Sequence, residues 1–477
     1  MTGFVHLRCR SEYSLGESII QVPELCCRAI ELGLDTVALT DSNNLHGALH
    51  FYKTAKEYGL KPIIGCEFRV SRMPSIPGPF FPRSEFQLML LARNQVGYQN
   101  LIQLVTKAHL EGDSSSPLVT KKMLSKHQKG LIALSSGLEG EVAYQLLHAG
   151  FNAGLEAAQQ YASIFPGCFC LEIQHCSLQK QVAHSDQLTE LAEALELDLI
   201  ATNDCRYLYP EDSEAFGTFL RMQEGSEQSG LQSMHINGED LHYCSPQEMK
   251  ITFAHIPKAL DNTLQIAQWC NLEMKSNPRH LPAQPPYRDT FREEELREKA
   301  WVGLEQRLQH MDGLPDRTAY QERLNHELEI ICLLGVAEYF LILEDVVSWS
   351  KTRGIPLGPG RGSAPGSLVN YVLGITDINP LPYGLLFEPF LNLQNQSIPA
   401  ISMDICDQRR EEVFSFIKDR YGQDKAVWVI SFLRKSLPEA ICEVGNAMGV
   451  DESVLERLAG IEIRNSRQLA PRAGPGE

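Results

Sequence analysis

A glycine-rich loop is the first feature of this chain that could perform phosphate chemistry. The segment from Gly358 to Ser367 reads GPGRGSAPGS, and an apolar stretch with helical character follows it from Leu368. Glycines let a backbone approach an anion closely, and a helix start adds a positive dipole end. The loop lacks the Gly-Lys-Ser/Thr of a Walker A motif, so a tight structural turn is the alternative. The predicted phosphate-binding residues are Gly360, Arg361, Gly362, Ser363, Gly366 and Ser367.

A second segment lies where a phosphoryl-transfer enzyme would place metal-binding carboxylates. Residues 398–406 read IPAISMDIC, and their alternation predicts a strand with Ala400, Ser402 and Asp404 on one face. Mg²⁺ takes hard oxygen ligands, and two-metal phosphoryl transfer uses carboxylates that bridge both ions. Alanine offers no ligand and serine only a neutral hydroxyl. We therefore expect only a weak metal ligand here, at Asp404.

Three further carboxylates follow predicted strands in the first part of the chain. Asp41, Glu67 and Asp204 stand at or near the ends of apolar runs. In α/β folds the active site gathers at the carboxyl ends of the strands, so these side chains could bind metal. Helix capping and turn formation are the alternative roles.

The elements that would position these carboxylates alternate between strand and helix. This alternation predicts an α/β fold, either a barrel or a layered sheet. The expected strands are Phe4–Cys9, Thr36–Thr40 and Lys61–Val70, and the expected helices are Pro23–Leu34 and Leu45–Tyr58.

Proline-rich residues 277–287 interrupt the pattern and indicate a linker. Helices are predicted after it, at Thr290–His310 and Thr318–Leu334, and the last residues lack periodicity. We expect a first domain over residues 1–275, a linker over 276–289, a second domain over 290–435, a partial third over 436–462 and a disordered tail over 463–477.

Composition limits the classes of protein to be considered. A chain of 477 residues with a formal charge of −17 is not a general nucleic-acid coating protein. No apolar run is long enough for a transmembrane helix and the N-terminus lacks signal-peptide anatomy, so we expect a cytoplasmic protein without membrane partners. The 13 cysteines lack paired metal spacing and are expected to be reduced thiols. A local basic cleft or a solvated helix face would explain Arg409, Arg410, Lys418 and Arg420 equally well.

Long motifs in both halves resemble a known family. GPGRGSAPGSLVNYVLGITDINPLPYGLLFEPFL and the upstream ERLNHELEIICLLGVAEYFLILEDVVSWSKTRGIPLGPGRGS are similar to the palm of the bacterial DNA polymerase III α subunit. FVHLRCRSEYSL, LDTVALTDSNNLHGALHFYKTAKEYGLKPIIGCE and LIATNDCRYLYPEDSEAF resemble the polymerase-and-histidinol-phosphatase (PHP) domain of that family. The resemblance implies a barrel-like PHP domain, a polymerase-β-like palm and the start of a helical thumb.

The resemblance also implies Mg²⁺-dependent DNA synthesis, but this chain departs from it in the palm. The two family aspartates that bind catalytic Mg²⁺ align with Ala400 and Ser402, and only Asp404 remains of the acidic triplet. The remaining catalytic aspartate, the fingers and the later domains of the family have no counterpart in this sequence. We therefore expect a truncated member that is catalytically inactive and binds no Mg²⁺ tightly.

The PHP motifs depart in the same way. The family histidines that gather metal ions correspond here to Arg8, Arg10, Ser42, Gln87 and Arg206, whereas the three carboxylates named above remain. We expect Arg8 and Arg10 to form ion pairs with Glu67 or Asp204, which would turn a metal pocket into a structural network.

Binding roles would survive such losses. We expect at most weak binding of DNA or a deoxynucleoside triphosphate, and replication proteins are conceivable partners. The alternatives are an active or error-prone polymerase fragment that needs another chain, or a decaying gene product without a selected role.

Overall fold

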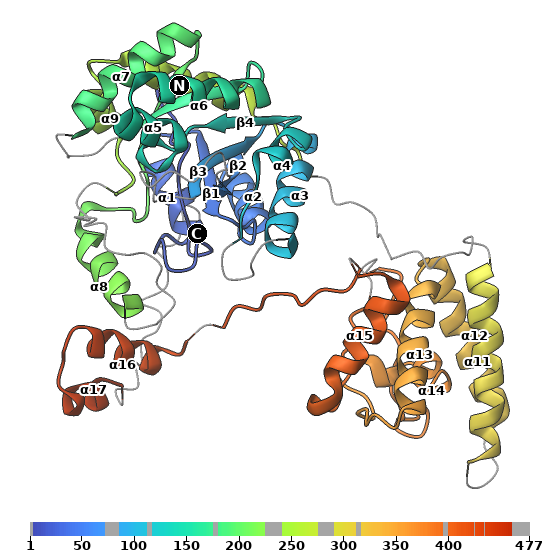
Figure 1. Ribbon diagram of the computed structural model, residues 1–477. Helices are drawn as coiled ribbons and strands as arrows, with labels where there is room; N and C mark the ends of the chain where they lie inside the picture. Colours follow the sequence, from blue (N-terminus) through green and yellow to red (C-terminus); the bar gives the residue numbers. More distant parts are fainter. Residues whose placement is uncertain are drawn as a thin grey trace. The chain divides into compact units, whose positions relative to one another are not determined.

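A computed structural model describes residues 3–71, 85–111, 117–174, 180–224, 241–274, 291–311, 316–394, 399–423, 425–433 and 435–459 (Figure 1). The chain forms two compact units, which are described separately: residues 1–275 with 434–477, and residues 276–433. The predicted linker over residues 276–289 and the predicted tail over 463–477 lie outside the described residues.

A six-stranded sheet forms the centre of the first unit, and its strands follow one another in chain order. Neighbours pair in parallel except at β2–β3 and β3–β4, which are antiparallel. The strands are β1 (Thr36–Ser42), β2 (Lys61–Ser71), β3 (Glu85–Ala92), β4 (Leu131–Leu134), β5 (Phe169–Gln174) and β6 (Leu199–Thr202).

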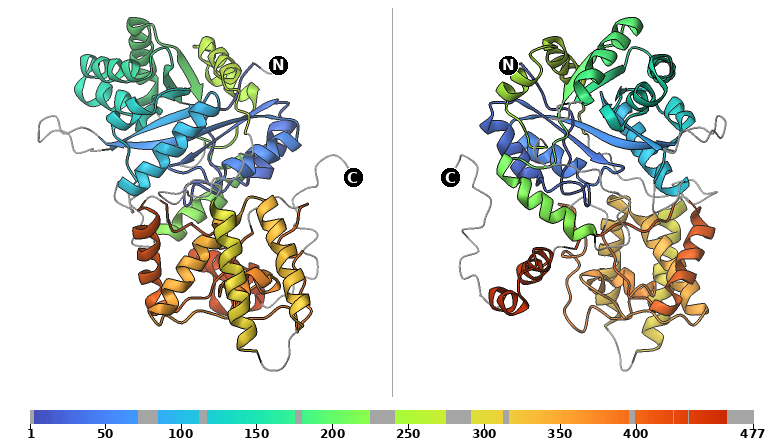
Figure 2. Two further views of the ribbon diagram at one scale, coloured as in Figure 1. Left: turned by 90° about the vertical axis from the view of Figure 1, so that its right-hand side faces the viewer. Right: turned by 60° about the vertical axis from the view of Figure 1, so that its left-hand side comes forward.

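Helices connect and cover these strands, as the further views show (Figure 2). Amphipathic α1 buries Val22, Leu25, Cys26 and Ala29, which recur at helical spacing. The helices of the unit are α1 (Val22–Glu31), α2 (Ala48–Glu57), α3 (Gln95–Glu111), α4 (Lys121–Lys126), α5 (Glu141–Ala149), α6 (Phe151–Ile164), α7 (Lys180–Leu195), α8 (Ser213–Glu224), α9 (Pro246–Thr252), α10 (Pro257–Trp269), α16 (Leu437–Ala447) and α17 (Glu452–Ala459). The predicted α/β class and two of the three expected strands are confirmed.

The strand predicted at Phe4–Cys9 is not formed, and the segment makes one isolated bridge, between Cys9 and Cys205. This segment meets β1 and the residues that follow β6 at isolated points: Thr40 N donates to Cys9 O over 2.8 Å, Cys205 N donates to Arg8 O over 3.2 Å, and Arg10 N donates to Cys205 O over 3.1 Å. The Cys9 amide donates instead to the Thr40 hydroxyl over 2.9 Å, which interrupts a regular ladder. The N-terminal segment thus bridges β1 and the end of β6 without being a strand.

One cluster of buried apolar side chains takes residues from all six strands, as in the interior of a barrel. Val5 and Leu7 of the N-terminal segment join it, and Ile266 and Ala267 of α10 pack against it. Contributors from the strands are Ala38, Ile63, Met89, Leu91, Ile132, Leu134, Cys170 and Ile200. This arrangement leaves the polar side chains near the carboxyl ends of β1 and β6 as a separate group.

The second unit is helical in its described residues. Its helices are α11 (Phe291–Gln309), α12 (Arg317–Leu333), α13 (Ala337–Thr352), α14 (Leu368–Val372) and α15 (Arg410–Tyr421). The first two confirm the predicted helices to within one residue. Leu304, Leu324, Leu328, Phe340 and Leu368 belong to the core that joins them.

The strand predicted at residues 398–406 is not formed. Residues 399–406 make one isolated bridge, between Ile405 and Leu357, so no ladder of neighbours exists to build a strand. The alternation itself is real, because Ala400, Ser402 and Asp404 are exposed while the residues between them are partly buried. The strands of the expected palm are therefore absent from the described part of this unit. Among the described residues, no helix is long and apolar enough to cross a bilayer.

Candidate functional site

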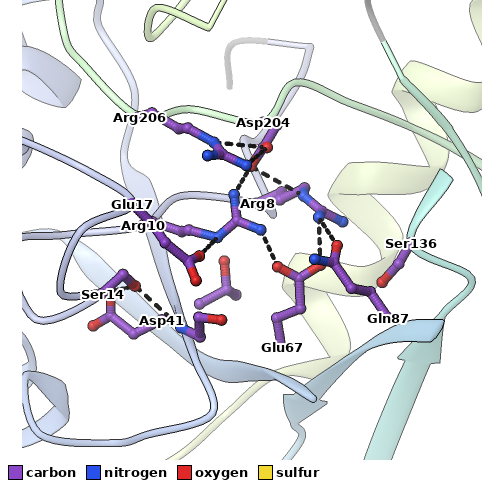
Figure 3. Close-up of polar contacts among 12 residues, drawn as sticks. Arg8, Arg10, Ser14, Glu17, Asp41, Glu67, Gln87, Ser136, Asp204 and Arg206 are labelled. Carbon is purple, nitrogen blue, oxygen red and sulfur yellow. Dashed lines mark hydrogen bonds and ion pairs between the residues drawn. The ribbon is translucent and has the colours of Figure 1, made fainter. Parts of the chain in front are cut away.

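Two buried arginines stand at the centre of the polar group in the first unit (Figure 3). Arg8 and Arg10 are each 1% exposed and come from the N-terminal segment. Alternate residues of an extended chain point the same way, so both guanidinium groups enter the same space. A buried charge is tolerated only where it is paired and hydrogen-bonded, which makes their partners the defining feature of the site.

Arg8 contacts three carboxylates and one amide. Its Nη2 pairs with Glu67 Oε1 and donates to Gln87 Oε1 over 3.1 Å. Its Nη1 lies 3.3 Å from Glu172 Oε1, and its Nε lies 3.2 Å from Asp204 Oδ1. Burial alone would lower the pKa of Arg8, but these carboxylates outweigh it and raise the pKa above its ordinary value. The group is therefore a fixed cation.

Arg10 completes the pairing from the other side. Its Nη2 pairs with the second oxygen of Glu67, its Nη1 donates to Asp204 Oδ1 over 2.5 Å, and its Nε lies 3.2 Å from Glu17 Oε2. Glu67 thus has one arginine on each carboxylate oxygen (Figure 3). The ion pairs expected from the sequence are formed, with both predicted carboxylates.

A third arginine pairs with Asp204 alone. Arg206 donates to Asp204 Oδ2 from Nε over 3.0 Å and from Nη2 over 2.9 Å. Burial would raise the pKa of Asp204, but Arg10, Arg206 and Arg8 together hold it well below its usual range. Asp204 is therefore ionised and surrounded by guanidinium groups.

Glu172 on β5 is a member of the site that the sequence analysis missed. It is fully buried, and it accepts hydrogen bonds from the Thr202 hydroxyl over 2.6 Å and from the Ser136 amide over 3.0 Å, besides its contact with Arg8. The available signal was a charged residue inside an otherwise buried strand, FCLEIQ.

Asp41 is held apart from this network by serines. It accepts from the Ser11 amide over 2.7 Å and from the Ser14 hydroxyl over 2.6 Å. Burial raises the pKa of Asp41, and the hydrogen bonds from Ser14 and Ser11 oppose that rise. Of the three predicted carboxylates, the structure joins Glu67 and Asp204 and gives Asp41 the turn-forming role.

The donor set does not fit a cluster of metal ions. A metal ion needs ligand atoms with lone pairs that are free to point at it, such as carboxylate oxygens or neutral imidazole nitrogens. Here guanidinium nitrogens already engage both oxygens of Glu67 and of Asp204. The arginines supply the positive charge that metal ions would bring, so this group of residues does not support a metal-dependent reaction.

The glycine-rich loop of the second unit is only partly open. Arg361, Gly362 and Ser363 are exposed, and Gly362 takes a positive φ of 63°, which suits glycine. Arg361 Nη1 donates to Asp404 Oδ1 over 3.0 Å, and the Gly358 amide donates to Asp404 O over 2.8 Å. The loop and the segment that carries Asp404 therefore lie against each other.

The helix start beyond this loop is occupied by the protein itself. Fully buried Glu327 of α12 accepts from the amides of Leu368 and Val369 over 2.9 and 3.0 Å and from the Ser367 hydroxyl over 2.8 Å. These are the orphan groups of α14 that would bind an external anion. The expectation of an open helix end is therefore wrong. Partly buried Gly360 and exposed Arg361, Gly362 and Ser363 are the part of the predicted loop that an external phosphate could reach.

The basic residues near α15 all have partners within the unit. Arg409 pairs with Glu412 over 2.7 Å, and Arg420 pairs with Asp345 over 3.1 Å. Arg410 lies over the ring of Trp428 and Lys418 over the ring of Phe414. This pairing favours a solvated helix face over a basic cleft.

Family models match residues in both units of the chain. Residues 6–176 match the PHP domain model, and residues 294–471 match the model of the bacterial DNA polymerase III alpha NTPase domain. DNA polymerase III subunit alpha of Campylobacter jejuni is 36% identical over 97% of this chain and 41% of its own length. The same subunit is 36% identical in Pseudomonas aeruginosa (96% of this chain, 39% of that protein) and 35% identical in Escherichia coli K12 (96% and 39%).

The chain spans about two fifths of the length of these relatives. A putative metal-dependent phosphoesterase from Bifidobacterium adolescentis covers 42% of this chain and 86% of its own at 14% identity, with a TM-score of 0.24, and supports no conclusion here. Over the length that it spans, this chain belongs to the family of the bacterial DNA polymerase III alpha subunit.

Proposed function

We propose that this chain is a non-catalytic member of the DNA polymerase III alpha family. The observation that carries the proposal is the pair of buried arginines on Glu67 and Asp204, whose guanidinium groups lie where the resemblance implies that PHP metal ions would bind. Removing these arginines would leave the carboxylates buried and unpaired, which is costly. The arginines that stand at the positions of the family histidines are therefore needed for the stability of this fold.

The second unit supports the same proposal independently. Ala400 and Ser402 occupy the exposed face where the resemblance expects carboxylates, and Asp404 is engaged by Arg361. One exposed aspartate with a cationic partner cannot bridge two Mg²⁺ ions. Nucleotidyl transfer by a two-metal mechanism has no ligand set among these residues.

What remains is binding. The proposed ligand is the phosphate of a deoxynucleotide or of DNA, held at partly buried Gly360 and exposed Arg361, Gly362 and Ser363, where Arg361 supplies the positive charge. The exposed Arg361–Asp404 pair is of the kind that contributes little to stability, so exchanging Asp404 for a phosphate costs little. Replication proteins are the partner class that the family suggests.

Three assays test the proposal. Purified protein with Mg²⁺ or Mn²⁺ is expected to show no primer extension, and no hydrolysis of a phosphomonoester, above the rate without protein. Fluorescence titration with labelled primed DNA is expected to show weak, salt-sensitive binding. A flat titration at low salt would remove the binding role, and metal-dependent turnover in either enzyme assay would remove the non-catalytic one.

A further inference from the structure

A second group of metal-ligating side chains lies in the first unit, apart from the arginine network. His242, Cys244 and Glu248 each place one ligand atom so that the three atoms lie within 4.8 Å of one another. His242 and Cys244 alternate along an extended segment next to Tyr207, and Glu248 stands at the third position of α9. The motif is His-x-Cys-x₃-Glu, which a search for paired cysteines does not detect.

We propose that His242, Cys244 and Glu248 form a Zn²⁺ site with three protein ligands and a fourth position open to water. With Zn–S near 2.3 Å and Zn–N or Zn–O near 2.0–2.1 Å, tetrahedral geometry separates S from N by about 3.6 Å and N from O by about 3.3 Å. Cys244 Sγ lies 3.4 Å from His242 Nε2, and His242 Nε2 lies 3.6 Å from Glu248 Oε1. Both separations agree with a shared tetrahedral ion.

The local structure prepares each ligand. Glu248 uses one oxygen in a capping box, where Oε2 accepts from the Ser245 amide over 2.6 Å, and this bond leaves Oε1 turned toward His242. Asn203 Nδ2 donates to His242 O over 2.7 Å and to Cys244 Sγ over 3.4 Å. A donor to the sulfur stabilises a thiolate, and such surrounding contacts orient metal ligands.

Burial and charge favour a transition metal with access from one side. The His242 side chain is 12% exposed and Cys244 is 1% exposed, whereas the Glu248 side chain is 51% exposed, so an ion could enter past Glu248. A thiolate and a carboxylate together neutralise a divalent ion. Sulfur and imidazole ligands suit Zn²⁺ and disfavour Mg²⁺ or Ca²⁺, which take oxygen ligands. The inference does not depend on the proposed loss of catalysis.

Titration of the full chain with Co²⁺, after removal of metals by a chelator, tests the site. We expect one equivalent to produce a near-ultraviolet thiolate-to-Co²⁺ band together with the visible bands of tetrahedral Co²⁺, and Zn²⁺ to displace both. Cys244→Ser should abolish the thiolate band. Cys168→Ser, which alters a partly buried cysteine elsewhere in the unit, should leave it unchanged.

Glu248→Gln keeps the assay decisive if Cys244→Ser does not fold. Glutamine also completes a capping box, so the fold should persist while Co²⁺ affinity falls more than about tenfold. Absence of the thiolate band in the unaltered chain would overturn the proposal. So would persistence of the band in Cys244→Ser, or an unchanged affinity in Glu248→Gln.

Discussion

Nη1 of Arg10 donates to Oδ1 of Asp204 over 2.5 Å, and the two residues are 194 positions apart in the chain. This contact ties the N-terminal segment to the end of β6, where regular strand pairing is missing. An ion pair thus joins these two segments, where a continuous hydrogen-bond ladder or a shared metal ion would be the alternative connection.

Arg10→Ala should destabilise the first unit strongly. The substitution leaves Glu67 and Asp204 with fewer partners in a buried site, and breaking a buried ion pair costs about 3–5 kcal/mol. Urea unfolding followed by circular dichroism measures the change. Glu31→Gln, which alters an exposed pair with Arg28 in the same unit, should cost less than about 1 kcal/mol. Equal effects of the two variants would contradict a structural role for the network.

Acid should weaken the network through Asp204. Because the folded-state pKa of Asp204 is well below its usual value, the stability it contributes is fully present above the unfolded pKa of about 3.9 and is lost as the pH falls toward the folded value. Asp204→Asn removes this contribution. The difference in unfolding free energy between the unaltered chain and the variant should therefore shrink below about pH 4. A difference that is constant from pH 7 to pH 2.5 would contradict the assignment.

Glu327→Ala should destabilise the second unit, because it leaves the amides at the start of α14 buried without acceptors. We expect a loss of about 3 kcal/mol in unfolding free energy, measured by urea unfolding. Glu329→Ala on the same helix is the control, since Glu329 is exposed and should change stability by less than about 0.5 kcal/mol. A loss of 0.5 kcal/mol or less in Glu327→Ala would show that the helix end has other partners.

Arg361→Ala should reduce the binding of a deoxynucleoside triphosphate without affecting the fold. The side chain is 68% exposed and, among the residues that the structure describes, forms an ion pair with Asp404 alone, so little stability depends on it. Calorimetry should show affinity falling about tenfold, which corresponds to about 1.4 kcal/mol. Arg317→Ala removes another exposed arginine of the same unit and should leave binding unchanged.

Local pattern predicted the α/β class and the elements β1, β2, α1, α2, α11 and α12, and its two wrong strands share one physical cause. Periodicity located α11 and α12 closely and recognised the two-faced character of residues 399–406. A strand, however, exists only with a neighbour to pair with, and Ile405 finds one partner at Leu357 while Cys9 finds one at Cys205. Such pairing between residues far apart in the chain cannot be predicted from a local sequence pattern.

The candidate site was predictable where it matched family motifs. Arg8, Arg10, Glu67 and Asp204 were identified as ion-pair partners because they replace or accompany known ligand positions. The sequence analysis does not identify Glu172 or Glu327. Glu172 is a lone charge in the apolar strand FCLEIQ, whereas Glu327 is one of several charged residues on α12, and the partners of both are visible only in three dimensions. The open helix end expected after Ser367 was wrong for the same reason, since Glu327 lies 40 residues away in sequence.

Primer extension by the purified chain tests the central claim most directly. A labelled primer–template, all four deoxynucleoside triphosphates and Mg²⁺ or Mn²⁺ would be incubated with increasing amounts of the protein. Asp404→Ala would be assayed in parallel. The account predicts no incorporation above the sample without protein in either case. Extension that rises with the amount of the unaltered chain and is lost in Asp404→Ala would contradict it.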